Sequence, residues 1–281
     1  MKKSLRSIMT VLAAAVLLVV PMVFQASAVG PKVSEPGNRH NLSATNVTNP
    51  YHAMGDSASN PRGQQVCIFC HTPHSANVAE QAPLWNRKFS SEVFQRYSGS
   101  TTFQIKNLAA AQYVSGSQPN GSSKLCLSCH DGVSRLGAVY NGPEIPMTLD
   151  VISGRASFKP STNKMKSGHH PVSFVYNAAV RGDINLVKTG YALPDNINYP
   201  EVKLDKQGRM QCTTCHDAHQ NQSHDDQCYP LGAACGAGDI KIAPFWVYGR
   251  GGSASTDQQT VCTTCHPMSE WPGFTRPLSP P

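Results

Sequence analysis

A five-residue pattern, Cys-x-x-Cys-His, occurs four times in this chain and constrains its fold more than any other feature. With 10 Cys and 11 His among 281 residues, random placement would give roughly 0.01 copies of the pattern. Four copies therefore indicate a shared chemical requirement rather than chance. The copies are Cys67–His71, Cys126–His130, Cys212–His216 and Cys262–His266.

The pattern predicts four covalently attached c-type haem groups (heme c). The two thiols of each copy would form thioether bonds to the porphyrin vinyl groups, and the adjoining imidazole would bind the iron. Cys-x-x-Cys pairs also build zinc ribbons, but zinc does not require a His directly after every second Cys. We therefore expect thioether bonds at Cys67, Cys70, Cys126, Cys129, Cys212, Cys215, Cys262 and Cys265, and proximal iron ligands at His71, His130, His216 and His266.

Residues 1–28 have the organisation of a secretory signal peptide. A basic start is followed by an apolar stretch over 8–24 and by small residues over 26–28. An uncleaved membrane anchor is the alternative, because the apolar stretch is marginally long enough to span a bilayer. The small-residue cleavage site and the polar sequence after it favour cleavage. We expect an exported chain with no membrane span after cleavage, which agrees with haem attachment outside the bacterial cytoplasm.

The composition predicts a mostly coil chain with short α-helices, organised around its haems. The chain has 22 Gly, 21 Pro and only 7% aromatic residues, so the haems would supply much of its interior. Segments 100–125 and 250–260 are rich in Ser, Thr, Gly and Gln and are expected to be loops. The 24 Lys and Arg residues are scattered among 17 Asp and Glu, which does not indicate a nucleic-acid partner.

Few regular elements are expected. Short helices are predicted over Ser91–Tyr97 and Phe103–Tyr113, and a helical turn is predicted at each haem motif. Val172, Phe174 and Tyr176 alternate in a short extended stretch, which does not suffice to predict a sheet.

The haem motifs belong to a larger pattern that occurs twice. Each half has a lone His followed by a polar or Pro residue, an aliphatic residue and a Ser. A haem motif extended by x-x-His comes next, and a plain haem motif follows it. The lone residues are His40 and His170, and the extensions end at His74 and His219. We therefore expect two dihaem modules, residues 29–150 and 151–281.

The x-x-His extension places one short segment against two haems. His74 follows His71 by about one helical turn on the same side, so it cannot reach the opposite face of the iron that His71 binds. If His74 binds iron, that iron belongs to a different haem, and the same holds for His219 relative to His216. Such a segment would bring two haems close enough for rapid electron transfer.

Four irons with two imidazoles each need four distal ligands. The repeat supplies His40, His74, His170 and His219. Within each module we expect the lone His to complete the first haem and the x-x-His to complete the second. His52 is an alternative to His40. His169 is an alternative to His170, although Pro171 fixes the backbone after His170 and favours that residue.

Cys228 and Cys235 are the two cysteines outside the haem motifs. They enclose Pro230 and Gly232 in a chain expected to be exported, so we expect a disulfide that closes a surface loop. A redox-active pair is the alternative, but nothing nearby suggests activation of a thiolate.

Segments 67–74, 212–219, 40–43 and 170–174 resemble the multihaem c-type cytochromes of metal-reducing bacteria with doubled Cys-x-x-Cys-His motifs. The haem count, expected export and length are most similar to the tetrahaem outer-surface cytochromes that polymerise into filaments, the outer-membrane cytochrome E type. The resemblance implies four stacked haems in a continuous chain inside a mostly coil polypeptide. It also implies a head-to-tail homopolymer. In such a polymer one haem takes its distal ligand from the neighbouring subunit, with His40 or His52 as the donor here.

Three functions follow from these expectations. The first is an electron-transfer protein without catalytic residues, which passes electrons between redox partner proteins and extracellular acceptors. Its location would be the outer cell surface or, as second choice, the periplasm. The second is a reductase of nitrite or hydroxylamine, which needs one open haem, and the supply of His weighs against it. The third is a membrane-anchored quinol dehydrogenase, which needs residues 8–24 retained and more closely spaced motifs.

Overall fold

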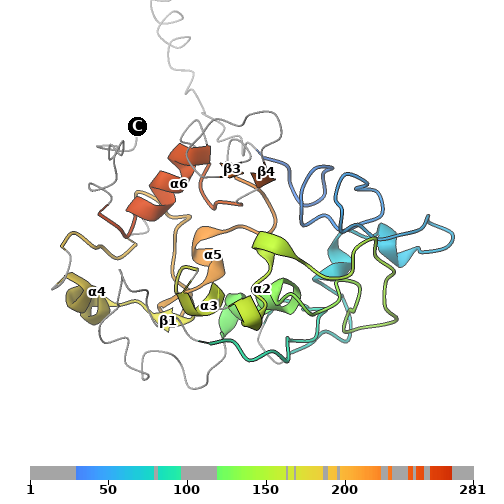
Figure 1. Ribbon diagram of the computed structural model, residues 1–281, viewed down its shortest axis with the longest axis horizontal. Coiled ribbons are helices and arrows are strands. Elements are labelled where there is room, and N and C mark those ends of the chain that lie inside the picture. The colour runs from blue at the N-terminus through green and yellow to red at the C-terminus, as the bar shows by residue number, and fades with distance from the viewer. Residues whose placement is uncertain are drawn as a thin grey trace, which may run out of the picture.

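The computed structural model describes residues 30–78, 82–95, 119–162, 164–167, 169–185, 189–194, 197–222, 227–229, 240–242, 245–249 and 254–267. Most of these residues lie in turns and irregular coil, with few short helices and strands (Figure 1). This agrees with the predicted mostly coil chain. No helix within the described part of the chain is long and apolar enough to cross a membrane. The predicted signal peptide and the predicted helix over 103–113 lie outside the described residues.

The elements follow one another as short units. The 3₁₀ helices are η1 (Arg62–Gln64), η2 (Cys67–Phe69), η3 (Gly154–Ala156) and η4 (Pro160–Thr162). The α-helices are α2 (Gly121–His130), α3 (Lys164–Ser167), α4 (Ala178–Asn185), α5 (Cys212–Cys215) and α6 (Ala254–Thr263). The strands are β1 (Phe174–Val175), β2 (Arg209–Met210), β3 (Gln227–Tyr229) and β4 (Ile240–Ile242).

Each haem motif lies on a helical turn, as predicted. The four turns are η2, α2, α5 and α6. The predicted loops were wrong where α2 begins at Gly121 and where α6 begins at Ala254. Polar composition favoured loops there, but tertiary packing overrides such weak local preferences.

The helix predicted to begin at Ser91 is absent over 91–95, where the chain is extended coil. Ser90 donates its hydroxyl to Asp131 Oδ2 over 2.5 Å, and its Oγ accepts the backbone N–H of Glu92 over 3.2 Å. Side-chain bonds of this kind compete with the helical ladder and prevent the helix from starting.

Two small antiparallel pairs complete the regular structure. β1 pairs with β2, with Phe174 opposite Met210, and β3 pairs with β4, with Gln227 opposite Ile242. β1 falls in the alternating stretch 172–176, where the sequence alone did not suffice to predict a sheet.

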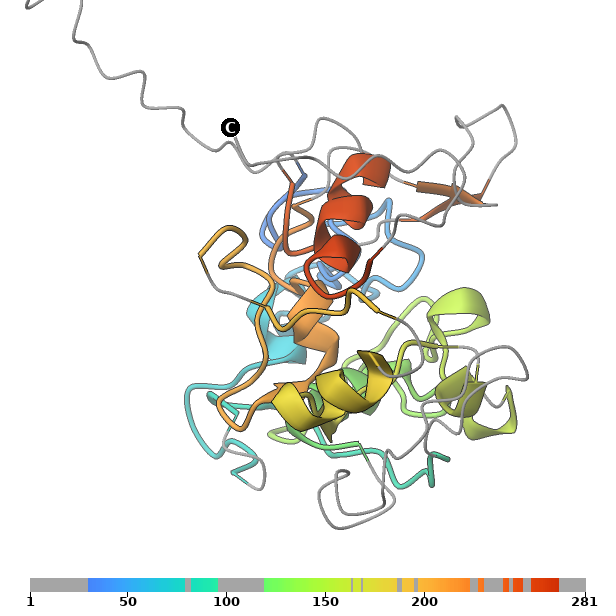
Figure 2. The same ribbon diagram turned by 90° about the vertical axis from the view of Figure 1, so that its left-hand side faces the viewer.

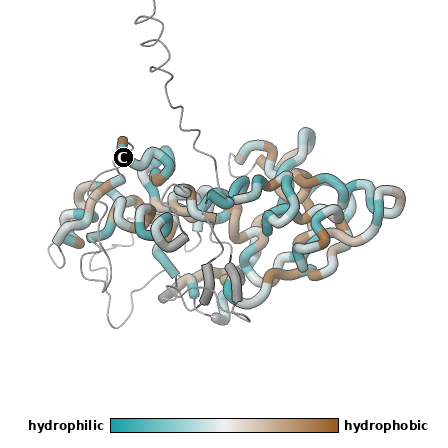
Figure 3. Tube along the Cα trace, turned by 90° about the horizontal axis from the view of Figure 1, so that it is seen from above, coloured by the Kyte–Doolittle hydropathy of each residue, from teal (hydrophilic) through white to brown (hydrophobic). Residues whose placement is uncertain are grey.

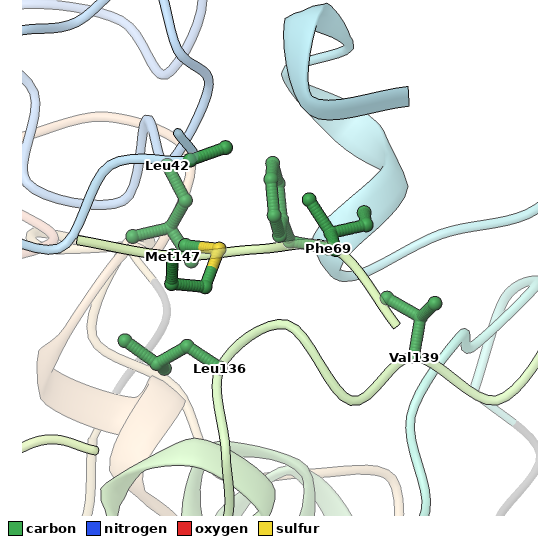
Figure 4. Packing of buried hydrophobic residues seen from close by; sticks show 7 residues of the cluster. Leu42, Phe69, Leu136, Val139 and Met147 are labelled. Carbon is green, nitrogen blue, oxygen red and sulfur yellow. The ribbon is translucent and has the colours of Figure 1, made fainter. Parts of the chain in front are cut away.

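Two separate apolar clusters replace one continuous core. Hydrophilic and hydrophobic residues are interspersed along the described part of the chain (Figure 3). One cluster gathers Leu42, Ala53, Phe69, Leu136, Val139, Ile145 and Met147 around η2 (Figure 4). The other gathers Phe174, Tyr176, Val180, Met210 and Cys265. One cluster therefore lies in each predicted module, and both include residues of a haem motif.

Candidate haem-binding sites

The four haem motifs lie next to one another in the order of the sequence. The thiols of Cys126 and Cys212 share a hydrogen bond, and the thiols of Cys70 and Cys129, and of Cys215, Cys262 and Cys265, are close enough to raise the pKa of Cys70 and of Cys215. Desolvation and the nearby thiol of Cys129 raise the pKa of Cys70 to about 12. Each motif thus lies close to the next one along the sequence, and this holds also for the second and third motifs, which belong to different predicted modules.

A buried glutamine joins the second motif to the third. α5 lies near the centre of the molecule against α2 (Figures 1 and 2). Gln211, which is 1% exposed, accepts the Ser123 hydroxyl over 2.6 Å and donates to Asn120 Oδ1 and Asp205 Oδ2, each over 3.0 Å. Gly121 has φ +54°, and a Cβ there would lie 2.8 Å from Gln211 Nε2, so a glycine is required for this approach.

Three pairs of imidazoles face each other at nearly the same separation. The ring centres are 6.2 Å apart for His71 and His219, 6.1 Å for His40 and His130, and 6.0 Å for His170 and His266. Each pair joins one predicted proximal ligand with one predicted distal ligand.

The separation fits a metal ion held between the two rings. A metal–imidazole bond is about 2 Å long and a ring nitrogen lies about 1 Å from its ring centre, so one shared metal places the centres about 6 Å apart. The residues present therefore fit a haem iron with two imidazole ligands at three of the four motifs.

The hydrogen bonds of the rings leave Nε2 available. Nδ1 of His71 lies 2.8 Å from the Pro83 carbonyl, and Nδ1 of His130 lies 2.7 Å from the Ala156 carbonyl. Nδ1 of His170 likewise lies 2.8 Å from the carbonyl of Pro171. An Nδ1–H that donates to a carbonyl fixes the tautomer in which Nε2 has a free lone pair, as in metal-ligating His residues.

His40 is held by a network of buried asparagines. Its backbone N–H donates to Asn38 Oδ1 over 2.7 Å, and Asn46 Nδ2 donates to the carbonyls of Asn38 and Asn41, each over 2.9 Å. Asn49 Nδ2 donates to the Arg39 carbonyl over 2.8 Å. Burial, followed by the charge of His130, lowers the pKa of His40 to about 3, so the ring stays neutral and competent to bind a metal.

The ring pairs differ from the pairs expected from chain order. The lone His of each module faces the second proximal ligand of that module, not the first. His219 faces His71 of the other module instead of serving the fourth motif. Chain order cannot distinguish these arrangements, because tertiary contacts decide which imidazole lies opposite each predicted proximal ligand.

The other His residues that the structure describes belong to none of these pairs. His74 is exposed. His52 Nδ1 lies 2.6 Å from the Asn49 carbonyl, and the ring of His169 packs against Phe158 with centres 4.5 Å apart. His216, the predicted proximal ligand of the third motif, lies against Trp246 with ring centres 4.8 Å apart.

A second duplicated segment, which the repeat described above does not include, holds the extended motifs. The sequence Ala-Pro-x-Trp occurs at 82–85 and at 243–246. Trp85 forms an antiparallel bridge with His71, and Trp246 forms the same bridge with His216. The residues before the two Trp, Leu84 and Phe245, have φ of 54° and 53°.

The two copies of this segment also share their hydrogen bonds. Thr72 N–H donates to the Leu84 carbonyl, and Asp217 N–H donates to the Phe245 carbonyl, each over 2.8 Å. Both indole Nε1 atoms are buried without a hydrogen-bond partner. Aligning the two halves of the sequence beyond the x-x-His would have revealed this signal.

The structure does not test the predicted disulfide. Cys235 lies outside the described residues, so the disulfide between Cys228 and Cys235 stays a prediction.

No protein-family model matches the chain, and no curated protein matches it.

Proposed function

We propose that this chain is an exported tetrahaem c-type cytochrome that transfers electrons, rather than an enzyme. The observation that supports this most is the set of three imidazole pairs at 6.0–6.2 Å, each with one member directly after a Cys-x-x-Cys. Bound haems supply reversible one-electron storage at each motif. Two protein ligands on an iron leave no position for a substrate, which favours electron transfer over the reduction of nitrite or hydroxylamine.

The line of motifs supports conduction from one end of the chain to the other. The second and third motifs are in contact through Cys126 and Cys212, and α2 and α5 are held together through Gln211. Attachment points this close bring successive haems near each other. The acceptors at the ends would be redox proteins or extracellular oxidants at the outer cell surface.

The duplication also supports a head-to-tail homopolymer. His219 of the second module faces the first proximal ligand of the first module, His71. By the same rule His74, its counterpart, would face His216 of a second module that another copy supplies. We therefore propose His74 as the ligand donated between copies, in place of His40, which faces His130 within its own chain.

Haem count and spin state test the proposed electron transfer. An alkaline pyridine spectrum should show four covalently bound haems per chain, and the EPR spectrum of the oxidised protein should be low-spin throughout. Fewer than four haems would end the proposal, and one high-spin haem that binds nitrite or cyanide would favour the reductase.

Electron microscopy of two matched variants tests the polymer. Wild type and His52→Ala should form fibres, while His74→Ala should remain as dispersed particles. Fibres of His74→Ala with four low-spin haems per chain would refute the donated ligand and leave electron transfer intact.

A further inference from the structure

Arg87 is a fully buried cation. Its side chain is among the largest with almost no exposure, at 1%. The guanidinium donates four hydrogen bonds to three backbone carbonyls: two to Ser128 over 3.2 and 3.1 Å, one to Leu136 over 2.7 Å and one to Arg135 over 2.8 Å. These carbonyls satisfy four of the five N–H donors, but they do not cancel the charge.

The position of Arg87 connects the first haem motif to the second. The preceding residue, Asn86, donates its backbone N–H to the Cys70 carbonyl over 2.8 Å and its amide to the Ile68 carbonyl over 2.6 Å. The guanidinium itself binds the carbonyl of Ser128, the residue before Cys129.

One acid faces the same region. Asp131 is buried beside His130, where its charge acts on the imidazole, and its carboxylate accepts the hydroxyls of Ser90 and Ser134. Arg87 and Asp131 form no ion pair within 4.0 Å. The second motif therefore lies near both charges, and the first motif lies near the cation.

The duplicated module provides an internal comparison. Aligning Trp85 with Trp246 places Arg87 opposite Tyr248. The segment that holds the third motif thus has a neutral residue where the segment that holds the first has a charge. The two copies of the segment therefore share the Trp but differ at the position of Arg87.

We propose that Arg87 sets a redox difference between the two modules by raising the reduction potentials of the haems at the first and second motifs. This inference rests on the proposed function. A buried positive charge favours the reduced iron over the oxidised iron, because the oxidised iron has one more positive charge. Low polarity around the buried charge strengthens this effect. The net rise in reduction potential is largest at the first motif, because the negative charge of Asp131 offsets part of the effect of Arg87 at the second. Electrons on the chain therefore reside preferentially at the first module.

Arg87→Met and Arg87→Lys separate the charge from the hydrogen bonds. Both variants lose the fork of carbonyl contacts, so both should lower the thermal stability of the holoprotein. Only Arg87→Met removes the charge, so only it should lower the midpoint potentials of the two haems, assigned by paramagnetic NMR. Lys88→Met removes the same charge from an exposed neighbour and should leave all four potentials unchanged.

A reciprocal variant keeps the test independent of the folding of Arg87→Met. Asp131→Asn should raise the potential of the second haem above its wild-type value. Equal potentials in wild type and Arg87→Met, an equal fall in Arg87→Lys, or an unmoved second haem in Asp131→Asn would each overturn the proposal. A wild-type protein with fewer than four attached haems would instead refute the proposed function, and the pyridine spectrum reports that outcome separately.

Discussion

Replacing Gln211 by Ala should separate the second motif from the third at a measurable cost in stability. The Ser123 hydroxyl, which is fully buried, loses its acceptor at 2.6 Å. Leaving a buried polar group unsatisfied costs about 1–3 kcal/mol. The small cavity left by the truncated chain adds about 1 kcal/mol. Asn120 and Asp205 are only partly buried and can regain water, so we expect a loss of about 2–4 kcal/mol.

Guanidinium unfolding of the holoprotein, followed by near-UV circular dichroism, measures this loss. Gln65→Ala is the matched control, because the Gln65 side chain is exposed and the change should cost under about 0.5 kcal/mol. Ser123→Ala combined with Gln211→Ala should cost less than the sum of the single changes, since both remove one contact. A Gln211→Ala protein as stable as the control, or strict additivity in the double variant, would refute the role of Gln211 in holding α2 against α5.

Three further outcomes follow from the contacts. His219→Ala should turn one haem in four high-spin in the EPR spectrum, and NMR assignment should place it at the first motif; a change at the fourth motif would contradict the observed pairing. The hydrogen bonds from Arg209 and Gln211 lower the pKa of Asp205 from 3.8 although burial raises it, so this carboxylate stabilises the fold above about pH 4 and loses that effect as pH falls. Asp205→Asn should flatten the acid limb of stability against pH, and an unchanged limb would count against this role. Asn49→Ala removes the 2.8 Å hydrogen bond to the Arg39 carbonyl, so it should loosen His40 and produce a fraction of high-spin haem at the second motif. A wild-type spectrum would show that the asparagine network does not hold His40.

Local features of the chain were predictable because local chemistry sets them. The Cys-x-x-Cys-His spacing places two thiols and an imidazole on one helical turn, and all four motifs lie on such turns. The burial of Leu42 and Val172, at 9% and 8%, beside the buried Ser43 and Ser173 likewise follows the repeated sequence around the lone His. Each of these depends on residues only a few positions apart.

The partners across space were decided by the tertiary structure. His71 faces His219 rather than a ligand of its own module, and Arg87 is buried although nothing in its sequence context distinguishes it from exposed basic residues. The helix expected at Ser91 does not form, because Ser90 bonds to the distant Asp131. The sequence by itself determined the proposed points of haem attachment, since each depends on residues adjacent in the chain. Which imidazole lies opposite each predicted proximal ligand, and which charge lies near it, depends on contacts between segments far apart in the chain, which no local pattern records.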